Sequence, residues 1–189
     1  AVVKRMPIPI DDLRKVQQLC YRKDDDIRWL IALLSDTGMR LAEAAGLAKE
    51  DVFLDTEIPH IRLCERPWRP LKTRSSERDV PLVGAALWAA TKAFENSPNE
   101  YLFPRYCSHK GCKADYASNS LNKWMKPFVP DRCVIHSFRH SLRDRLRVFE
   151  CPSDIIDQIG GWKTAGVGQY YGTGFELDVL FQCMKKLNL

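Results

Sequence analysis

Most of this chain carries the spacing of amphipathic helices, and one stretch interrupts it with strand character. The clearest helix is Asp24–Ser35, where Ile27, Leu30, Ile31 and Leu34 recur at i, i+3, i+4 and i+7. Further helices are predicted at Ile10–Arg22, Met39–Gly46, Ala85–Phe94, Ser118–Lys126, Ser137–Phe149, Ser153–Ile159 and Glu176–Leu187. These patterns predict a mainly α fold.

The interruption lies between Asp51 and Leu82. Ile58–Leu63 and Arg78–Leu82 have the composition of short strands, and a basic hairpin or loop that contains Lys72 joins them. The segment Cys107–Tyr116 is predicted to be an irregular loop. The fold class is therefore α+β: mainly α with a small antiparallel β-sheet.

Length and composition limit the organisation of the chain. Its 189 residues, 45% of them hydrophobic, are enough for one well-packed domain, so we expect residues 1–189 to form a single domain. The first residue is Ala1, and we expect the chain to be a piece of a longer protein. It contains no apolar run as long as the roughly 18 to 20 residues that span a bilayer. We therefore expect no membrane contact.

Charge and cysteine content narrow the possible partners and the compartment. The net charge of +5 is modest but compatible with a polyanionic partner, and arginines cluster in Arg62–Arg78 and Arg139–Arg147. A planar guanidinium grips two phosphate oxygens at once, so these clusters favour phosphate as the ligand. The seven cysteines are scattered and odd in number, which indicates reduced thiols rather than a disulfide framework.

Two short motifs each place a pair of ionisable side chains about one helical turn apart. In Thr37–Glu43, Gly38 ends a helix, and Arg40 and Glu43 share a face of the next one. Glu43 would then hold the Arg40 guanidinium toward a cleft, although a simple surface ion pair would show the same spacing. His136 and Arg139 could meet one phosphate together, or they could be a solvated helix start.

A third motif lies near the C-terminus. Trp162 follows two glycines, and Tyr171 comes nine residues later in a glycine-rich segment. Packing is the ordinary role of such aromatic residues. Glycines on both sides, however, favour a turned or mobile segment, which suits a tyrosine that must approach a phosphorus atom.

Taken in order, these motifs resemble the catalytic domain of the tyrosine recombinases, the phage integrase family, over nearly the whole chain. The family's Thr-Gly-x-Arg-x-x-Glu motif is matched at Thr37–Glu43, and its His-x-x-Arg motif at His136–Arg139. Its Leu-Gly-His/Trp motif is matched loosely at Ile159–Trp162, where a second glycine precedes the tryptophan. The family's spacing selects Tyr171 rather than Tyr170. Lys72 fits the family's hairpin lysine, although hairpin length varies.

The resemblance implies a role for each residue. Tyr171 would attack a DNA phosphodiester, giving a 3′-phosphotyrosyl intermediate and a free 5′ hydroxyl, and religation would need no ATP. The remaining catalytic residues are expected to be Arg40 and Arg139 as phosphate ligands, Glu43 as their orienting group, Lys72 as general acid, His136 as base and Trp162 as a donor or packing support. No cofactor and no metal are expected.

Partners and location also follow from the resemblance. They are double-stranded DNA and, in the full-length protein, a homotetramer on DNA held through the C-terminal helix. The stripe Leu177–Leu187 would suit that contact, or equally packing in cis. The family's N-terminal core-binding and arm-binding domains are expected to be missing from this chain, and the location is expected to be the bacterial cytoplasm, at the nucleoid when active. Backbone contacts to DNA are expected from Arg66, Arg69, Arg74, Arg78, His140 and Arg143.

Three alternatives stay open. A type IB topoisomerase would use the same chemistry to relax DNA without exchanging strands, and a non-catalytic DNA-binding domain could keep the fold. Separately, Cys107, His109 and Cys112, with Cys133 as a distant fourth, could supply zinc ligands, but their spacing is irregular for a structural zinc site.

Overall fold

The computed structural model describes residues 4–164 and 174–188 of the chain. The α-helices of this part are α1 (Ile10–Lys23), α2 (Asp26–Ser35), α3 (Leu41–Ala45), α4 (Gly84–Asn96), α5 (Ala114–Met125), α6 (Ser137–Val148), α7 (Ser153–Gly160) and α8 (Leu177–Met184). The short 3-10 helices are η1 (Lys49–Asp51), η2 (Arg74–Ser76), η3 (Lys126–Phe128) and η5 (Lys185–Asn188). The strands are β1 (Val52–Phe53), β2 (His60–Leu63), β3 (Arg78–Pro81), β4 (Cys107–Ser108) and β5 (Gly111–Cys112). The mainly α prediction is confirmed.

Local sequence explains where the first two helices begin and end. Acidic residues occupy the first turn of α1 and basic residues its last turn, so both ends complement the helix dipole. Asp25 caps α2, because its side chain accepts a hydrogen bond from the backbone N–H of Arg28 at 3.0 Å. The predicted bounds of both helices agree with the structure to within two residues.

The strands form two small antiparallel sheets in the described residues. In the first, β2 lies between β1 and β3, with Ile61 opposite Val80 and Leu63 opposite Arg78. The sequence did not predict β1. The second sheet is the hairpin β4–β5, in which Cys107 faces Cys112. The predicted irregular loop over Cys107–Tyr116 was therefore wrong in its first half, and α5 begins four residues earlier than expected.

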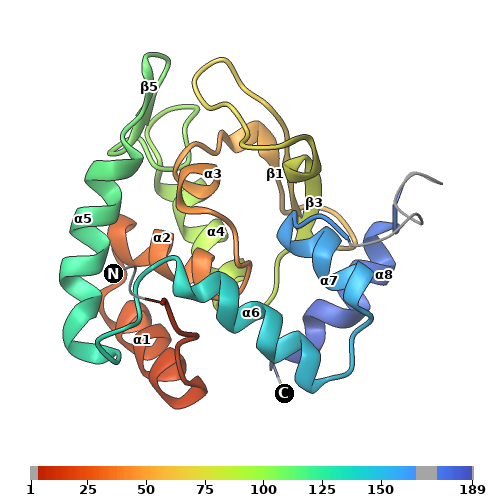
Figure 1. Ribbon diagram of the computed structural model, residues 1–189. Helices are drawn as coiled ribbons and strands as arrows, with labels where there is room; N and C mark the ends of the chain where they lie inside the picture. The colour runs from red at the N-terminus through yellow and green to blue at the C-terminus, as the bar shows by residue number, and fades with distance from the viewer. Residues whose placement is uncertain (1–3, 165–173, 189) are drawn as a thin grey trace.

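Buried apolar side chains divide into two clusters. The larger one contains residues of the five helices from α1 through α5 and of β1 and β2, among them Leu30 and Leu34. It also contains Phe138, from α6. The smaller one joins β3 with α6, α7 and α8, and includes Leu142 and Ile159. Figure 1 shows α6 running between the group of α1, α2 and α5 and the group of α7 and α8. Because α6 contributes to both clusters, side chains at its start lie at their junction.

The apolar stripe of the C-terminal helix packs on its own chain. Leu180, Met184 and Leu187 are buried in the smaller cluster, where α8 packs against β3. The carbonyl of Leu187 accepts a hydrogen bond from Nη2 of Arg14 at 2.7 Å. These residues of the stripe are thus buried within their own chain, and a role of this helix between subunits stays a prediction. Within the described ranges, no helix combines the length and apolar character needed to cross a membrane.

Candidate active site

A tight turn after α2 sets the position of the first basic group. The hydroxyl of Thr37 donates to the carbonyl of Leu33 at 2.7 Å, and Gly38 follows with a positive φ of 63°. A Cβ at Gly38 would lie 2.5 Å from Cδ2 of Leu142, so both conformation and space require glycine here. The turn places Arg40 at the N-cap of α3.

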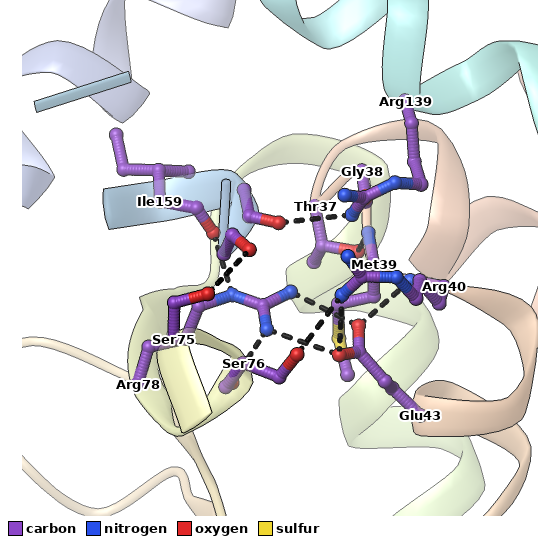
Figure 2. Close-up of polar contacts among 12 residues, drawn as sticks. Thr37, Gly38, Met39, Arg40, Glu43, Ser75, Ser76, Arg78, Arg139 and Ile159 are labelled. Carbon is purple, nitrogen blue, oxygen red and sulfur yellow. Dashed lines mark hydrogen bonds and ion pairs between the residues drawn. The ribbon is translucent and has the colours of Figure 1, made fainter. Parts of the chain in front are cut away.

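Glu43 holds Arg40 by both its backbone and its side chain. Oε1 of Glu43 accepts the backbone N–H of Arg40 at 2.8 Å, and Oε2 accepts its Nη1 at 3.2 Å. Nη1 of Arg40 also donates to Oγ of Ser76 at 3.2 Å (Figure 2). Burial raises the pKa of the Glu43 carboxyl, but Arg78 and Arg40 outweigh this and hold it below its ordinary value. Glu43 is therefore an ionised anchor.

Arg139 comes from the first turn of α6 and is held differently. Its Nη1 donates to the carbonyls of Gly38, at 2.8 Å, and Gly160, at 3.0 Å, and the residue is only 3% exposed. Burial, and then the like charges of Arg40 and Arg78, lower the pKa of Arg139 to about 9. It makes no ion pair among the described residues. This is an under-compensated cation, which an anion would stabilise.

Trp162 is a stacking surface for two arginines. Its ring centroid lies 4.6 Å from Cζ of Arg139 and 4.0 Å from Cζ of Arg143. The ring lies over Gly160, where a Cβ would approach Cζ3 of the indole to 1.9 Å. Gly160, the first of the two glycines before the tryptophan, thus has a steric cause. Of the two roles expected for Trp162, the contacts support packing.

His136 stands at the solvent-accessible start of α6. Partial desolvation, followed by the positive charges of Arg139, His140, Arg40 and Lys72, holds the pKa of His136 below its ordinary value. The imidazole is therefore neutral at neutral pH and able to accept a proton. His140 stacks edge-on against it, with ring centroids 5.7 Å apart. Lys72 is exposed in the β2–β3 connection, within electrostatic reach of His136.

The residues expected to contact the DNA backbone divide by burial. Arg74 is exposed, and His140 and Arg143 are partly exposed. Arg66 pairs with Glu50 at 2.9 Å and with Asp51. Arg69 and Arg78 are only 1% and 7% exposed. The guanidinium groups of these two residues serve the protein interior, and their predicted contact with the DNA backbone gains no support from the structure.

Arg69 shows what the interior role is. Its Nη1 donates to the carbonyl of Glu43 at 3.2 Å, its Nη2 donates to the carbonyl of Cys64, and its aliphatic stem fills the space over Gly46. It thus connects the β2–β3 loop to α3. Nε of Arg69 is buried and has no hydrogen-bond partner in the described part of the chain.

Sequence reasoning missed Ser76 and misjudged the role of Arg78. Ser76 is fully buried and binds Arg40, while Arg78 makes a two-pronged contact with Glu43. A signal for Arg78 was present. Side chains alternate along a strand, so Arg78 shares a face with Val80, which is fully buried. An arginine on the apolar face of a strand indicates a buried partner.

Two predictions concern the remaining residues. Tyr171, the predicted nucleophile, and Tyr170 lie outside the described residues. The zinc alternative gains no support: Cys107 and Cys112 face each other with sulfur atoms 2.8 Å apart, but Cys133 contacts the carbonyls of Met6 and Pro7. Among the described residues, no three His, Cys, Asp or Glu side chains are grouped to hold a metal ion.

The described residues bring two guanidinium groups together in one region. Arg40 and Arg139 come from segments 99 positions apart, and Figure 2 shows their guanidinium groups pointing toward the same region, next to the turn at Gly38. A neutral imidazole and an exposed ammonium group lie nearby. Fixed cations with an adjacent base and acid are what transfer of a phosphoryl group requires.

Comparison with known proteins identifies the fold. The fold is that of the tyrosine recombinases: the Tn1549 transposon integrase, solved in complex with circular intermediate DNA, matches with a TM-score of 0.64 and 16% identity over 98% of this chain. XerA recombinase matches with a TM-score of 0.62 and 18% identity over 96%. A lambda integrase tetramer bound to a Holliday junction matches with a TM-score of 0.59 and 15% identity over 90%.

Family membership follows from the amino-acid sequence. A model of the phage integrase family matches residues 11–174, and the chain belongs to that family. No curated protein matches the chain. The chain spans 68%, 63% and 48% of the three structural relatives, respectively, so they contain further parts.

Proposed function

We propose that this chain is the catalytic domain of a site-specific DNA recombinase, in which Tyr171 cleaves and rejoins a DNA strand. One observation above all supports this. Arg139 is a buried cation without a carboxylate partner in the described residues, directed with Arg40 at one region beside a neutral histidine. Such a site would bind a phosphodiester, and the motif spacing of the family assigns the nucleophile to Tyr171.

The chemistry follows from the charges. The phenol oxygen of Tyr171 attacks phosphorus in line, and His136 accepts the phenolic proton. Negative charge grows on the non-bridging oxygens, where Arg40 and Arg139 stabilise it. The bond to the 5′ oxygen breaks as Lys72 donates a proton to that oxygen, which would otherwise be a poor leaving group. The products are a 3′-phosphotyrosyl strand and a 5′ hydroxyl.

Rejoining reverses these steps. The 5′ hydroxyl of the same or another strand attacks the phosphotyrosine, and Tyr171 leaves as a phenol. The covalent bond stores the energy of the cleaved linkage, so no ATP is needed. Recombination would follow when the attacking strand comes from a second duplex in a tetramer on DNA. We assign no role in that tetramer to α8, whose apolar stripe is covered in cis.

A nicked suicide substrate tests the proposal. Loss of a short fragment beyond the cleavage position traps the covalent adduct, which is detected as a shifted band in denaturing gels. Wild type and Tyr170→Phe should form the adduct, and Tyr171→Phe should not. Adduct loss with Tyr170→Phe alone would show that the nucleophile is misassigned, and DNA binding without any adduct would favour a non-catalytic domain.

Two further measurements separate the alternatives. Cleavage should persist in EDTA, because the two guanidinium groups do the work that metal ions do in other nucleases. A strict requirement for magnesium would contradict this. The full-length parent should exchange strands between two marked sites; relaxation of supercoils alone would indicate a type IB topoisomerase activity instead.

A further inference from the structure

Arg78 is the most highly connected cation beside the proposed site, yet it cannot reach substrate. Its Nη2 donates to Oε1 of Glu43 at 3.0 Å, and its Nη1 donates to Oε2 at 3.1 Å. Nη1 also donates to the carbonyl of Ser76 at 2.6 Å, and Nε donates to the carbonyl of Ile159 at 2.9 Å. The side chain is only 1% exposed, so its contacts are all internal.

Through these contacts, the planar guanidinium group of Arg78, its fork, connects three parts of the site. Glu43 also binds Arg40, and the hydroxyl oxygen of Ser76 accepts a hydrogen bond from the Arg40 guanidinium. Ile159 is in the last turn of α7 (Figure 2). Gly161 touches the fork as well, since a Cβ there would lie 2.7 Å from Nη1 of Arg78. Trp162 follows directly, and the chain then leads to Tyr171.

An ordinary structural ion pair would not need this geometry. Lysine would supply the same charge, but it has no planar fork with which to bind both oxygens of Glu43 and a carbonyl at once. The same strand offers a contrast: Asp79 pairs with Arg62, which is 63% exposed, and that pair contacts no residue of the site. The fork of Arg78 is directed at the residues around Arg40.

We propose that Arg78 is a positioning residue of the DNA-cleavage site: it fixes Glu43, and through Glu43 the guanidinium of Arg40, and it anchors the end of α7 from which the chain leads to Tyr171. The inference rests on the proposed function. It adds that the preorganisation of Arg40 depends on a strand residue that never touches phosphate.

The test compares two substrates on the full chain. Wild type, Arg78→Met, Arg78→Lys and the control Arg105→Met, which breaks an exposed ion pair with Asp26 outside both arginine clusters, are mixed with saturating suicide substrate. The rate of adduct formation is measured in a single turnover. Arg78→Met should slow the reaction roughly 10- to 100-fold, less than loss of a direct transition-state donor. Arg78→Lys should fall between it and wild type, and Arg105→Met should match wild type.

A second substrate separates positioning from general damage to the fold. It carries a neutral methylphosphonate at the cleaved position, in which a methyl group replaces one non-bridging oxygen and its negative charge, so that less is demanded from Arg40. The defect of Arg78→Met should shrink at least several-fold on it. An equal defect on both substrates, or an unchanged rate on the phosphodiester, would overturn the inference. If Arg78→Met does not fold, the same comparison on Arg78→Lys decides.

A readout without catalysis keeps this inference distinct from the proposed function. The Glu43 carboxyl is titrated by carbon NMR: its pKa should rise more in Arg78→Met than in Arg40→Met, because the charge of Arg78 lowers it most. Inorganic phosphate should also perturb the Arg40 Nε–H signal less strongly in Arg78→Met. If wild type forms no adduct but both shifts occur, the recombinase proposal falls and the positioning role stands; if neither shift occurs, the positioning role falls.

Discussion

Arg40 and Arg139 carry the same side chain to the same region, but the protein holds them by opposite means. Arg40 is held by a carboxylate and a hydroxyl, and it shares the negative charge of Glu43 with Arg78. Arg139 is held by two backbone carbonyls and an indole ring, and it makes no ion pair with a carboxylate in the described residues. The contacts of Arg40 therefore fix its geometry, whereas Arg139 is a buried positive charge that makes no ion pair among the described residues.

Removing Glu43 should affect stability most. In Glu43→Gln the guanidinium of Arg78 stays buried without its counter-charge, which should lower the free energy of unfolding by about 3–5 kcal/mol at pH 7 in urea titrations. Asp79→Asn, which breaks the exposed pair with Arg62, is the control and should change little. Equal losses in the two variants would refute the idea that Arg40's side depends on a buried ion pair.

The pH dependence sharpens the same point. Because the pKa of Glu43 is lower in the folded state than in the unfolded chain, its contribution to stability is present above the unfolded pKa. That contribution is lost as pH falls through the folded pKa. The difference in unfolding free energy between wild type and Glu43→Gln should therefore narrow in acid; a constant difference would argue against an ionised Glu43.

Removing Arg139 should affect chemistry rather than stability. Arg139→Met should slow adduct formation by about 10²–10³-fold, the cost of losing one preorganised donor to a developing oxyanion. Its unfolding free energy should hold or rise, since a desolvated cation is removed from beside Arg40 and Arg78. A large loss of stability with normal cleavage would contradict the inference that Arg139 contributes to cleavage rather than to stability.

Trp162 should have a smaller effect. Trp162→Leu removes the ring that stacks on Arg139 and Arg143, interactions worth about 0.5–2 kcal/mol. Cleavage should slow by a corresponding factor, and Trp162→Phe, which keeps an aromatic face, should retain more activity than Trp162→Leu. Equal rates for the two variants would show that the ring serves only as filling.

The smallest expected effect is the pH profile of cleavage. With DNA below saturation, the rate should rise with pH and level off below about 6.5, the ordinary pKa of histidine, because His136 titrates lower than that in the free protein. His136→Gln should abolish this rise. A plateau reached only above neutral pH would indicate that another group accepts the proton.

The sequence predicted the helices well and the supporting contacts poorly. Amphipathic periodicity is local, so α1, α2 and α6 could be placed within a few residues. The sequence motifs also predicted that Arg40, Glu43 and Arg139 lie in one site. Burial depends on partners far along the chain, however, so Arg69 and Arg78 were taken for surface cations. The two-residue strands of the β4–β5 hairpin were too short for alternation to reveal.

The close contact between Gly160 and the indole of Trp162 limits which substitutions this protein can accept. A methyl group at position 160 would overlap the ring, so no side chain can be gained there unless position 162 changes too. The dependence runs in one direction: a side chain at position 160 requires a smaller residue at position 162, whereas the tryptophan can be exchanged while Gly160 stays, and that exchange opens space above the glycine.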